Sequence, residues 1–186
     1  MGKNIRGWVE VRRQWEGVKP PYNVSWAGII AVGDLLDRNY DMFGSLFGVT
    51  TSHFIPIAPS RGPPQDVSEQ ASDDYLTWES VMGETWVSWS EIKTIAWNEE
   101  TVDYRPHAYV LDETGQLVYV ERANPEATDP MEEGSTWQIG ASVFKREKIS
   151  RSAFLRSDWR LLFRLMEDLA AEYGDEGIRL VAWFDY

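Results

Sequence analysis

Two arginines stand out among the residues that could do chemistry, because each lies where an anion could be held. Arg38 begins a segment that we place at the first turn of a helix, where free backbone N–H groups and the helix dipole favour an anion. Arg61 lies at the tip of a proline-rich loop, and its forked guanidinium can bind a phosphate or a carboxylate at two points. Two tryptophans could add a stacking wall. The sequence therefore predicts one concave site for an anionic, nucleotide-like ligand, formed by Arg38, Asn39, Tyr40, Arg61, Trp86 and Trp89.

The same arginines have a structural alternative. Arg38 and Arg61 could pair with Asp37, Asp41 or Asp66 and hold the loop in place without any ligand. The two interpretations predict opposite results for Arg61→Ala. A ligand site would lose binding with little change in melting temperature, whereas a structural ion pair would lose melting temperature and have no binding to lose.

A helix and a stiff loop must position these residues. Apolar residues recur at helical spacing from Leu36 to Phe47, with Asp37 as the expected N-terminal cap and Gly48 as the stop. The next segment, residues 50–65, carries four prolines and excludes a regular element. Long ordered loops in compact domains are often functional. We expect its PIAPSRG part, residues 56–62, to fold back beside the N-terminus of the helix.

The chain is poor in groups for catalysis or metal binding. It has no cysteine, which excludes disulfides, thiol nucleophiles and cysteine metal sites. Its two histidines, His53 and His107, lie in no ligand-spaced motif, so each is expected to be a surface or hydrogen-bonded side chain. No phosphate loop, dinucleotide fingerprint or nucleophile elbow is present. We predict no catalytic residue, no metal and no cofactor.

Charge is distributed unevenly along a chain whose net charge is −12. Residues 66–133 contain 17 Asp and Glu against 3 Lys and Arg, a balance of −14, whereas residues 145–164 have a balance of +5. Duplex nucleic acid needs a broad basic footprint, so we expect no such partner. The simplest interpretation is a solvated surface with internal ion pairs. The alternative is an acidic 66–133 face that docks on a basic protein partner.

The order of elements favours an α+β fold, a mainly antiparallel sheet with packed helices, in a single domain over residues 1–186. Residues 107–111 and 116–122 read as a hairpin that turns at Gly115. A helix capped by Ser157 or Asp158 runs to Tyr173, with a core stripe of Leu162, Leu165, Met166, Leu169 and Tyr173. Residues 178–184 are apolar on both faces, as in a central strand. We predict that the hairpin and this strand share one sheet, with the helix packed on it.

Other elements are expected from shorter patterns. Residues 5–12, 24–32 and 135–144 read as strands. A capping box at Ser88–Glu91 begins a short helix that we extend to Trp97. No segment approaches the about 18 apolar residues of a membrane span, and the first residues form no apolar signal region. We therefore expect a cytoplasmic protein without a membrane partner.

Four segments together resemble the signature of an uncharacterised family of bacterial and bacteriophage proteins. They read RNYDMFGSLFG, PIAPSRGPP, WVSWSEI and RLVAWFD, and the resemblance spans most of the chain. Relatives of this kind have histidines before the Trp-x-Ser/Thr-Trp motif, where this chain has Met82-Gly83-Glu84-Thr85. Chemistry that depends on those histidines would be absent here. The resemblance transfers no established activity, but it suggests a phage-type protein acting in the host cytoplasm.

Three functional hypotheses follow. The first is a non-enzymatic binding protein, in the phage setting an anti-defence sponge for an anionic nucleotide-like ligand. The second is an acidic protein-interaction inhibitor or adaptor that acts through the 66–133 face. The third is a cryptic or degenerate hydrolase. A homo-oligomer is compatible with each of them.

Overall fold

The computed structural model describes residues 2–14, 17, 24–52, 54–126 and 128–185. The chain divides into two compact units. The first unit comprises Met1–Thr51, Ile55–Ala96 and Phe154–Tyr186, and the second comprises Ser52–Phe54 and Trp97–Ala153. Helices and antiparallel sheets together give the predicted α+β class, which is confirmed.

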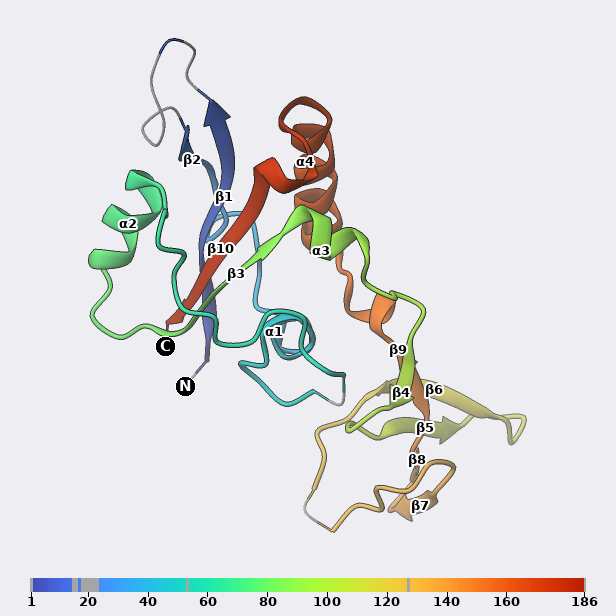
Figure 1. Cartoon of the computed structure of the whole chain (residues 1–186). Coiled ribbons are helices and arrows are strands. Elements are labelled where there is room, and N and C mark those ends of the chain that lie inside the picture. The colour runs from blue at the N-terminus through green and yellow to red at the C-terminus, as the bar shows by residue number, and fades with distance from the viewer. Residues whose placement is uncertain (1, 15–16, 18–23, 53, 127, 186) are drawn as a thin grey trace. The chain divides into compact units, whose positions relative to one another are not determined.

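The first unit is built on a four-stranded antiparallel sheet with the strand order β2–β1–β10–β3 (Figure 1). Its strands are β1 (Asn4–Gln14), β2 (Val24–Ala31), β3 (Met82–Ser88) and β10 (Ile178–Asp185). Every residue of β10 is buried. The prediction of a central strand at 178–184 is confirmed, because an element covered on both faces needs apolar residues on both.

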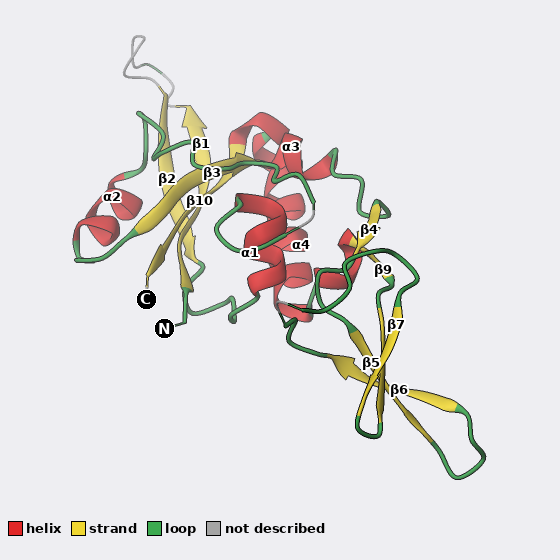
Figure 2. Ribbon diagram, turned by 90° about the horizontal axis from the view of Figure 1, so that it is seen from below, coloured by secondary structure: helices red, strands yellow, loops and turns green. Residues whose placement is uncertain are grey.

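Helices lie against both faces of this sheet (Figure 2). On one face are α1 (Tyr40–Phe47) and α4 (Ser157–Tyr173), and on the other is α2 (Glu69–Leu76). Phe184 of β10 packs against two α1 rings, Phe43 and Phe47, with centroids 5.1 and 5.7 Å apart. Trp159 of α4 lies 6.4 Å from Phe43. These fully buried rings form the centre of the core.

The boundaries of α1 differ from the prediction at one end. Asn39 is the N-cap instead of Asp37, because its side-chain oxygen accepts the Met42 N–H at 3.2 Å while its amide nitrogen donates to the Phe154 carbonyl at 2.8 Å. Gly48 ends the helix in the left-handed conformation (φ 67°), as predicted.

The loop over residues 50–65 contains no helix or strand in its described part, as predicted, but the expected position of residues 56–62 is wrong. It lies beside the C-terminal end of α1, where the Ala58 N–H donates to the Leu46 carbonyl at 2.8 Å. The last carbonyls of a helix lack partners within it and accept such donors. The loop also reaches β3, because the Gly62 N–H donates to the Glu84 carbonyl at 2.9 Å.

The helix α4 begins at Ser157 and ends at Gly174, close to the prediction, although neither Ser157 nor Asp158 caps it: Arg156 is the N-cap and makes no side-chain capping bond. Its core stripe differs in part. Leu162 and Met166 are fully buried as expected, together with Trp159, whereas Leu165 and Leu169 are only half-buried and Tyr173 is exposed. The stripe is therefore rotated toward the side that carries Trp159.

The short helix α3 (Trp89–Lys93) has the predicted capping box at Ser88 and Glu91. It ends at Thr94 and not at Trp97, because the Thr94 hydroxyl donates to the Glu91 carbonyl at 2.8 Å. Two 3-10 turns, η1 (Arg151–Phe154) and η2 (Asp175–Gly177), flank α4. The helix α2 has no strong apolar stripe, with Ala71 as its buried residue, and the sequence patterns did not predict it.

The second unit holds a two-stranded ribbon of β4 (Glu100–Val102) and β9 (Lys148–Ser150), and a four-stranded antiparallel sheet with the order β6–β5–β8–β7. The hairpin of β5 (His107–Leu111) and β6 (Leu117–Arg122) is confirmed, with Gly115 at φ 79°. The predicted strand at 135–144 is two strands, β7 (Thr136–Ile139) and β8 (Ser142–Lys145), because Gly140 turns the chain at φ 61°.

The predicted sharing of one sheet by the hairpin and the 178–184 strand is wrong. Both edges of β10 are taken, one by β1 and the other by β3. The hairpin instead extends through β8, which pairs Ala108 with Phe144. Among the described residues, no helix has the length and the apolar character that crossing a bilayer would require.

Candidate functional site

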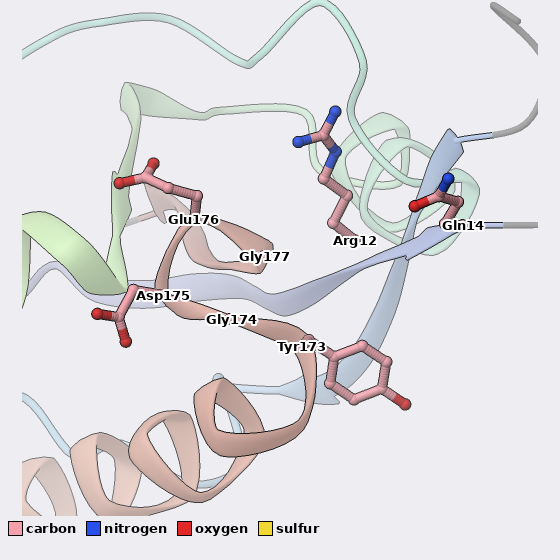
Figure 3. Close-up of a pocket in the computed structure, with 7 residues that line it drawn as sticks. All are labelled: Arg12, Gln14, Tyr173, Gly174, Asp175, Glu176 and Gly177. Carbon is pink, nitrogen blue, oxygen red and sulfur yellow. The ribbon is translucent and has the colours of Figure 1, made fainter.

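An open hollow of about 560 Å³ lies in the first unit where α4 passes into β10 (Figure 3). Arg12 and Gln14 of β1 line it together with the turn that carries Asp175 and Glu176. Asp175 already pairs with Lys93 at 2.5 Å. With both signs of charge and one aromatic side chain, Tyr173, this open hollow does not select one class of ligand.

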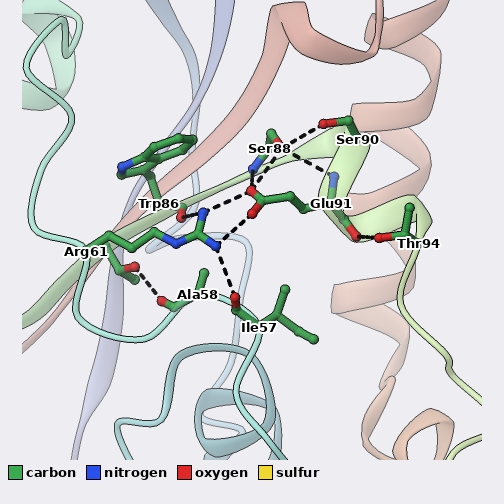
Figure 4. A network of polar contacts seen from close by, with 9 residues as sticks. Ile57, Ala58, Arg61, Trp86, Ser88, Ser90, Glu91 and Thr94 are labelled. Carbon is green, nitrogen blue, oxygen red and sulfur yellow. Dashed lines mark hydrogen bonds and ion pairs between the residues drawn. The ribbon is translucent and has the colours of Figure 1, made fainter.

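Both terminal nitrogens of the Arg61 guanidinium are bonded within the protein (Figure 4). It forms two parallel bonds with Glu91, Nη2 to Oε1 at 2.7 Å and Nη1 to Oε2 at 3.0 Å. It also donates to the Ile57 carbonyl at 3.0 Å and to the Trp86 carbonyl at 3.2 Å. A bidentate pair of this kind is geometrically specific. It ties the proline-rich loop to α3.

Glu91 serves the α3 capping box at the same time. Its Oε2 accepts the Ser88 backbone N–H at 3.0 Å and the Ser88 hydroxyl at 2.9 Å. Burial alone would raise the pKa of Glu91, but the hydrogen bonds from Arg61 and Ser88 outweigh it and hold that pKa below its usual value. The carboxylate thus joins loop, strand end and helix in one charged network.

The two predicted stacking residues have different surroundings. The Trp86 ring lies beside two cations, with the Arg61 guanidinium 5.2 Å and the Arg179 guanidinium 6.0 Å from its centroid. Trp89 is 7% exposed and packs near Phe163 of α4. Trp89 is therefore a core residue, and Trp86 already has cationic neighbours.

Arg38, Asn39 and Tyr40 form a second group at the other end of α1. The Arg38 Nε donates to the Asn4 side chain at 2.7 Å, and the Tyr40 hydroxyl accepts the Lys3 N–H at 3.2 Å. Asn39 is 1% exposed and has both side-chain atoms engaged in the helix cap.

The structure therefore places the six predicted site residues in two groups. Arg38, Asn39 and Tyr40 lie at the N-terminal end of α1, whereas Arg61, Trp86 and Trp89 lie where the proline-rich loop meets β3 and α3. The hollow of about 490 Å³ that Arg38 lines includes neither Arg61 nor Trp86. Asn4, the partner of Arg38, and Trp8, in register with Trp86 across β10, are four positions apart on β1. That separation is about 13 Å of strand.

A buried charge network that the sequence patterns did not indicate lies on the α2 face of the sheet. Arg179 of β10 donates to Glu10 of β1 at 2.6 Å and to the Asp66 carboxylate at 2.7 Å. Its guanidinium lies 3.8 Å from the Trp26 ring centroid. Glu10 also accepts the Ser68 N–H at 2.8 Å. Burial would raise the pKa of Asp66, but the Arg179 bond and charge hold it below its usual value. The signal in the sequence was Arg179 inside the apolar run of β10, whereas Glu10 gave none, because β1 carries several other charged residues.

A small apolar pocket of about 260 Å³ lies beside α2 on this same face. Tyr75 and Trp183 form an aromatic corner, edge to face with centroids 5.5 Å apart. The Tyr75 hydroxyl donates to the Glu84 carboxylate at 2.9 Å. That bond to an anion, and then burial, raise the pKa of Tyr75. The pocket could not be predicted without α2.

The polar cluster around His107 in the second unit is fully bonded. The two ring nitrogens lie 3.1 Å from an Asp103 oxygen and 2.9 Å from a Glu147 oxygen, and Arg122 donates to Asp103 at 2.6 Å. Burial would raise the pKa of Asp103, but the Arg122 bond outweighs it and lowers that pKa. Burial and the bond to Glu147 raise the pKa of Tyr109 to about 12. With a carboxylate at each nitrogen, the ring has no atom left to take a proton from a substrate.

No group of three or more His, Asp or Glu side chains within the described ranges is placed to hold a metal ion. The expected role of His53 lies outside the described residues.

The β5–β6 hairpin carries the most exposed apolar surface of the second unit. Six of its large apolar side chains are between 37% and 59% exposed, and we call them the hairpin surface: Val110, Leu111, Leu117, Val118, Tyr119 and Val120. The strand β6 is an edge of its sheet. Exposed acids flank the surface at Asp112, Glu113 and Glu121. Asp112 shapes the tip by accepting bonds from Thr114 and from the Gln116 N–H.

Comparison of the chain with protein-family models, with characterised proteins and with solved structures returned no match. The resemblance to bacterial and phage proteins stays a prediction.

Proposed function

We propose that the protein is a non-enzymatic interaction module, an inhibitor or adaptor that binds a basic protein partner through the hairpin surface. The observation that carries this proposal is the exposure of six large apolar side chains on one hairpin. Exposed apolar side chains gathered on one element often mark an interaction site. Both strands contribute, so a partner that encloses the hairpin would bury apolar area on both of its faces.

The acids around the hairpin surface favour a partner with a basic rim. Asp112 and Glu113 lie at the tip, and Glu121 lies on the edge strand. Complementary charge steers encounter and fixes orientation. A second copy of this chain fits less well, because each copy carries a net charge of −12. The partner that the surface fits is a protein with an apolar cleft bordered by Lys and Arg.

The nucleotide-sponge hypothesis has less support from the geometry. Arg61, its main cation, donates to Glu91 and to two carbonyls. An incoming anion would have to replace a carboxylate that already makes two charge-assisted bonds. The hypothesis stays a prediction. The degenerate-hydrolase hypothesis has no carrying observation, since His107 has both nitrogens engaged.

Site-specific photocrosslinking in cells tests the proposal. A benzophenone amino acid at Tyr119 should give one crosslinked partner protein, and the same probe at Leu161, an exposed apolar position of α4, should not. A double change, Val118→Thr with Val120→Thr, should remove that partner while keeping the fold. Crosslinking only to a second copy, or equal crosslinking at both positions, would reject the proposal.

A further inference from the structure

The pocket beside α2 is independent of the hairpin surface, because all its lining residues belong to the first unit. At about 260 Å³ it is smaller than the about 300–1,000 Å³ of drug-sized ligand sites. Its apolar walls come from Val67 just before α2, Leu76 on α2 and Val181 on β10. It therefore suits a small ligand with an apolar body.

The aromatic corner adds a preference for positive charge. Tyr75 and Trp183 meet edge to face with centroids 5.5 Å apart, and both line the pocket. The faces of aromatic rings attract cations, and indole does so most strongly. An anionic ligand would gain nothing from the ring faces.

One carboxylate completes the site. Glu84 lines the pocket and is held by the Tyr75 hydroxyl at 2.9 Å. Within the described part of the chain, its carboxylate makes no ion pair with a Lys, Arg or His. Glu10, the buried acid of this face, does have such a partner in Arg179. Glu84 is thus an oriented negative charge beside an apolar hollow.

We infer that this pocket binds a small organic cation, an alkylammonium group whose carbon chain packs against the aromatic corner while its nitrogen donates to Glu84. The net charge of −12 would raise the local concentration of such a cation. The group could belong to a free amine or to a lysine side chain of another protein. The chemistry recognised is the same in both.

Calorimetric titration with three probes of matched size tests the inference. We expect n-pentylammonium to bind, and 1-pentanol and pentanoate to bind at least about tenfold more weakly, because a charge-assisted hydrogen bond is lost. Equal binding of 1-pentanol would show that the pocket recognises only the apolar chain. Absence of n-pentylammonium binding would show that the pocket is not a binding site for this cation. Both results would overturn the inference.

Variants separate the carboxylate from a general charge effect. Glu84→Gln keeps an acceptor for Tyr75 but removes the charge, so binding of n-pentylammonium should fall at least about tenfold. Glu79→Gln removes the same charge from an exposed residue outside the pocket and should leave binding unchanged. Equal effects of the two changes would contradict the inference.

The source of the cation is distinguished by a fourth probe, the tripeptide Gly-Lys-Gly with blocked ends. Tighter binding of the tripeptide than of n-pentylammonium would indicate a protein side chain. Tighter binding of the free amine would indicate a small molecule. Failure of the hairpin crosslinking would leave this result untouched, since the two tests use different units of the chain.

Discussion

The attachment of the proline-rich loop to the rest of the first unit depends on single side chains. Arg61 carries the fork that could have bound a ligand, but Glu91 supplies a matching carboxylate from the first turn of α3. A guanidinium with four hydrogen bonds to the protein acts as a clamp. The alternative interpretation, in which Arg61 forms an ion pair that holds the loop, named Asp37, Asp41 or Asp66 as the partner. The observed partner is Glu91.

Replacing Arg61 with Ala should lower the free energy of unfolding by about 1–2 kcal/mol, because a partly exposed charged pair and two further bonds are lost. Urea denaturation measures this. Arg61→Lys should recover only part of the loss, since lysine lacks the fork. Arg13→Ala, at an exposed position on β1, serves as the control and should change stability by less than about 0.5 kcal/mol. An unchanged stability of Arg61→Ala would contradict the clamp.

The same pair should make stability depend on pH in the acid range. The pKa of Glu91 is lower in the folded protein than its ordinary value of about 4.3. Its contribution is therefore fully present above that ordinary value and is lost as pH falls through the lower, folded pKa. The difference in unfolding free energy between wild type and Glu91→Gln should be constant above about pH 5.5 and should shrink below about pH 4. A difference that grows on acidification would refute this.

For the helices, the packing of the core determines which side chains are buried and so contribute most to stability. The sequence pattern of α4 allowed several leucines into its stripe, but Leu162 is fully buried while Leu165 and Leu169 are half-buried. The reason is the place of Trp159, which packs between the α1 rings and Phe163 and so turns the helix.

Leu162→Ala should cost about 2–5 kcal/mol of unfolding free energy, as expected for a fully buried leucine. Leu169→Ala should cost about 1–2 kcal/mol, because its half-buried side chain removes less area from water. Thermal and urea unfolding of both variants would check the order. A larger loss for Leu169→Ala would show that the helix is rotated the other way.

For the whole molecule, the division into two units matters most. The first unit has an aromatic core between its sheet and two helices, whereas the second has small sheets and a buried arginine, Arg146, that donates to the Asp103 and Tyr104 carbonyls. Parts of a protein with different local packing open with different free energies. The expectation of one domain over residues 1–186 stays a prediction that an exchange experiment can decide.

Arg146→Met should speed amide exchange in β5 and β8 of the second unit, because the buried bonds to two carbonyls are lost. Amides of β1 and β10 should keep their protection if the units open separately. Hydrogen exchange followed by mass spectrometry resolves the two sets. Equal loss of protection everywhere would indicate a single cooperative domain.

The sequence by itself determined the elements whose signals are local. The hairpin at Gly115, the stop of α1 at Gly48 and the capping box at Ser88 were all predictable, because turn and cap residues act over a few positions. The central strand β10 was predictable from an apolar run.

Only the tertiary structure decided which elements meet. It placed the proline-rich loop at the C-terminal end of α1, paired Arg61 with Glu91, and put the hairpin in a different sheet from β10. It also made the pocket of Tyr75, Glu84 and Trp183, in which Tyr75 and Trp183 are 108 positions apart in the sequence. The physical reason is that pairing of strands, and of a cation with one of many acids, depends on which edges and charges remain unsatisfied once the chain has packed, and no local pattern records that.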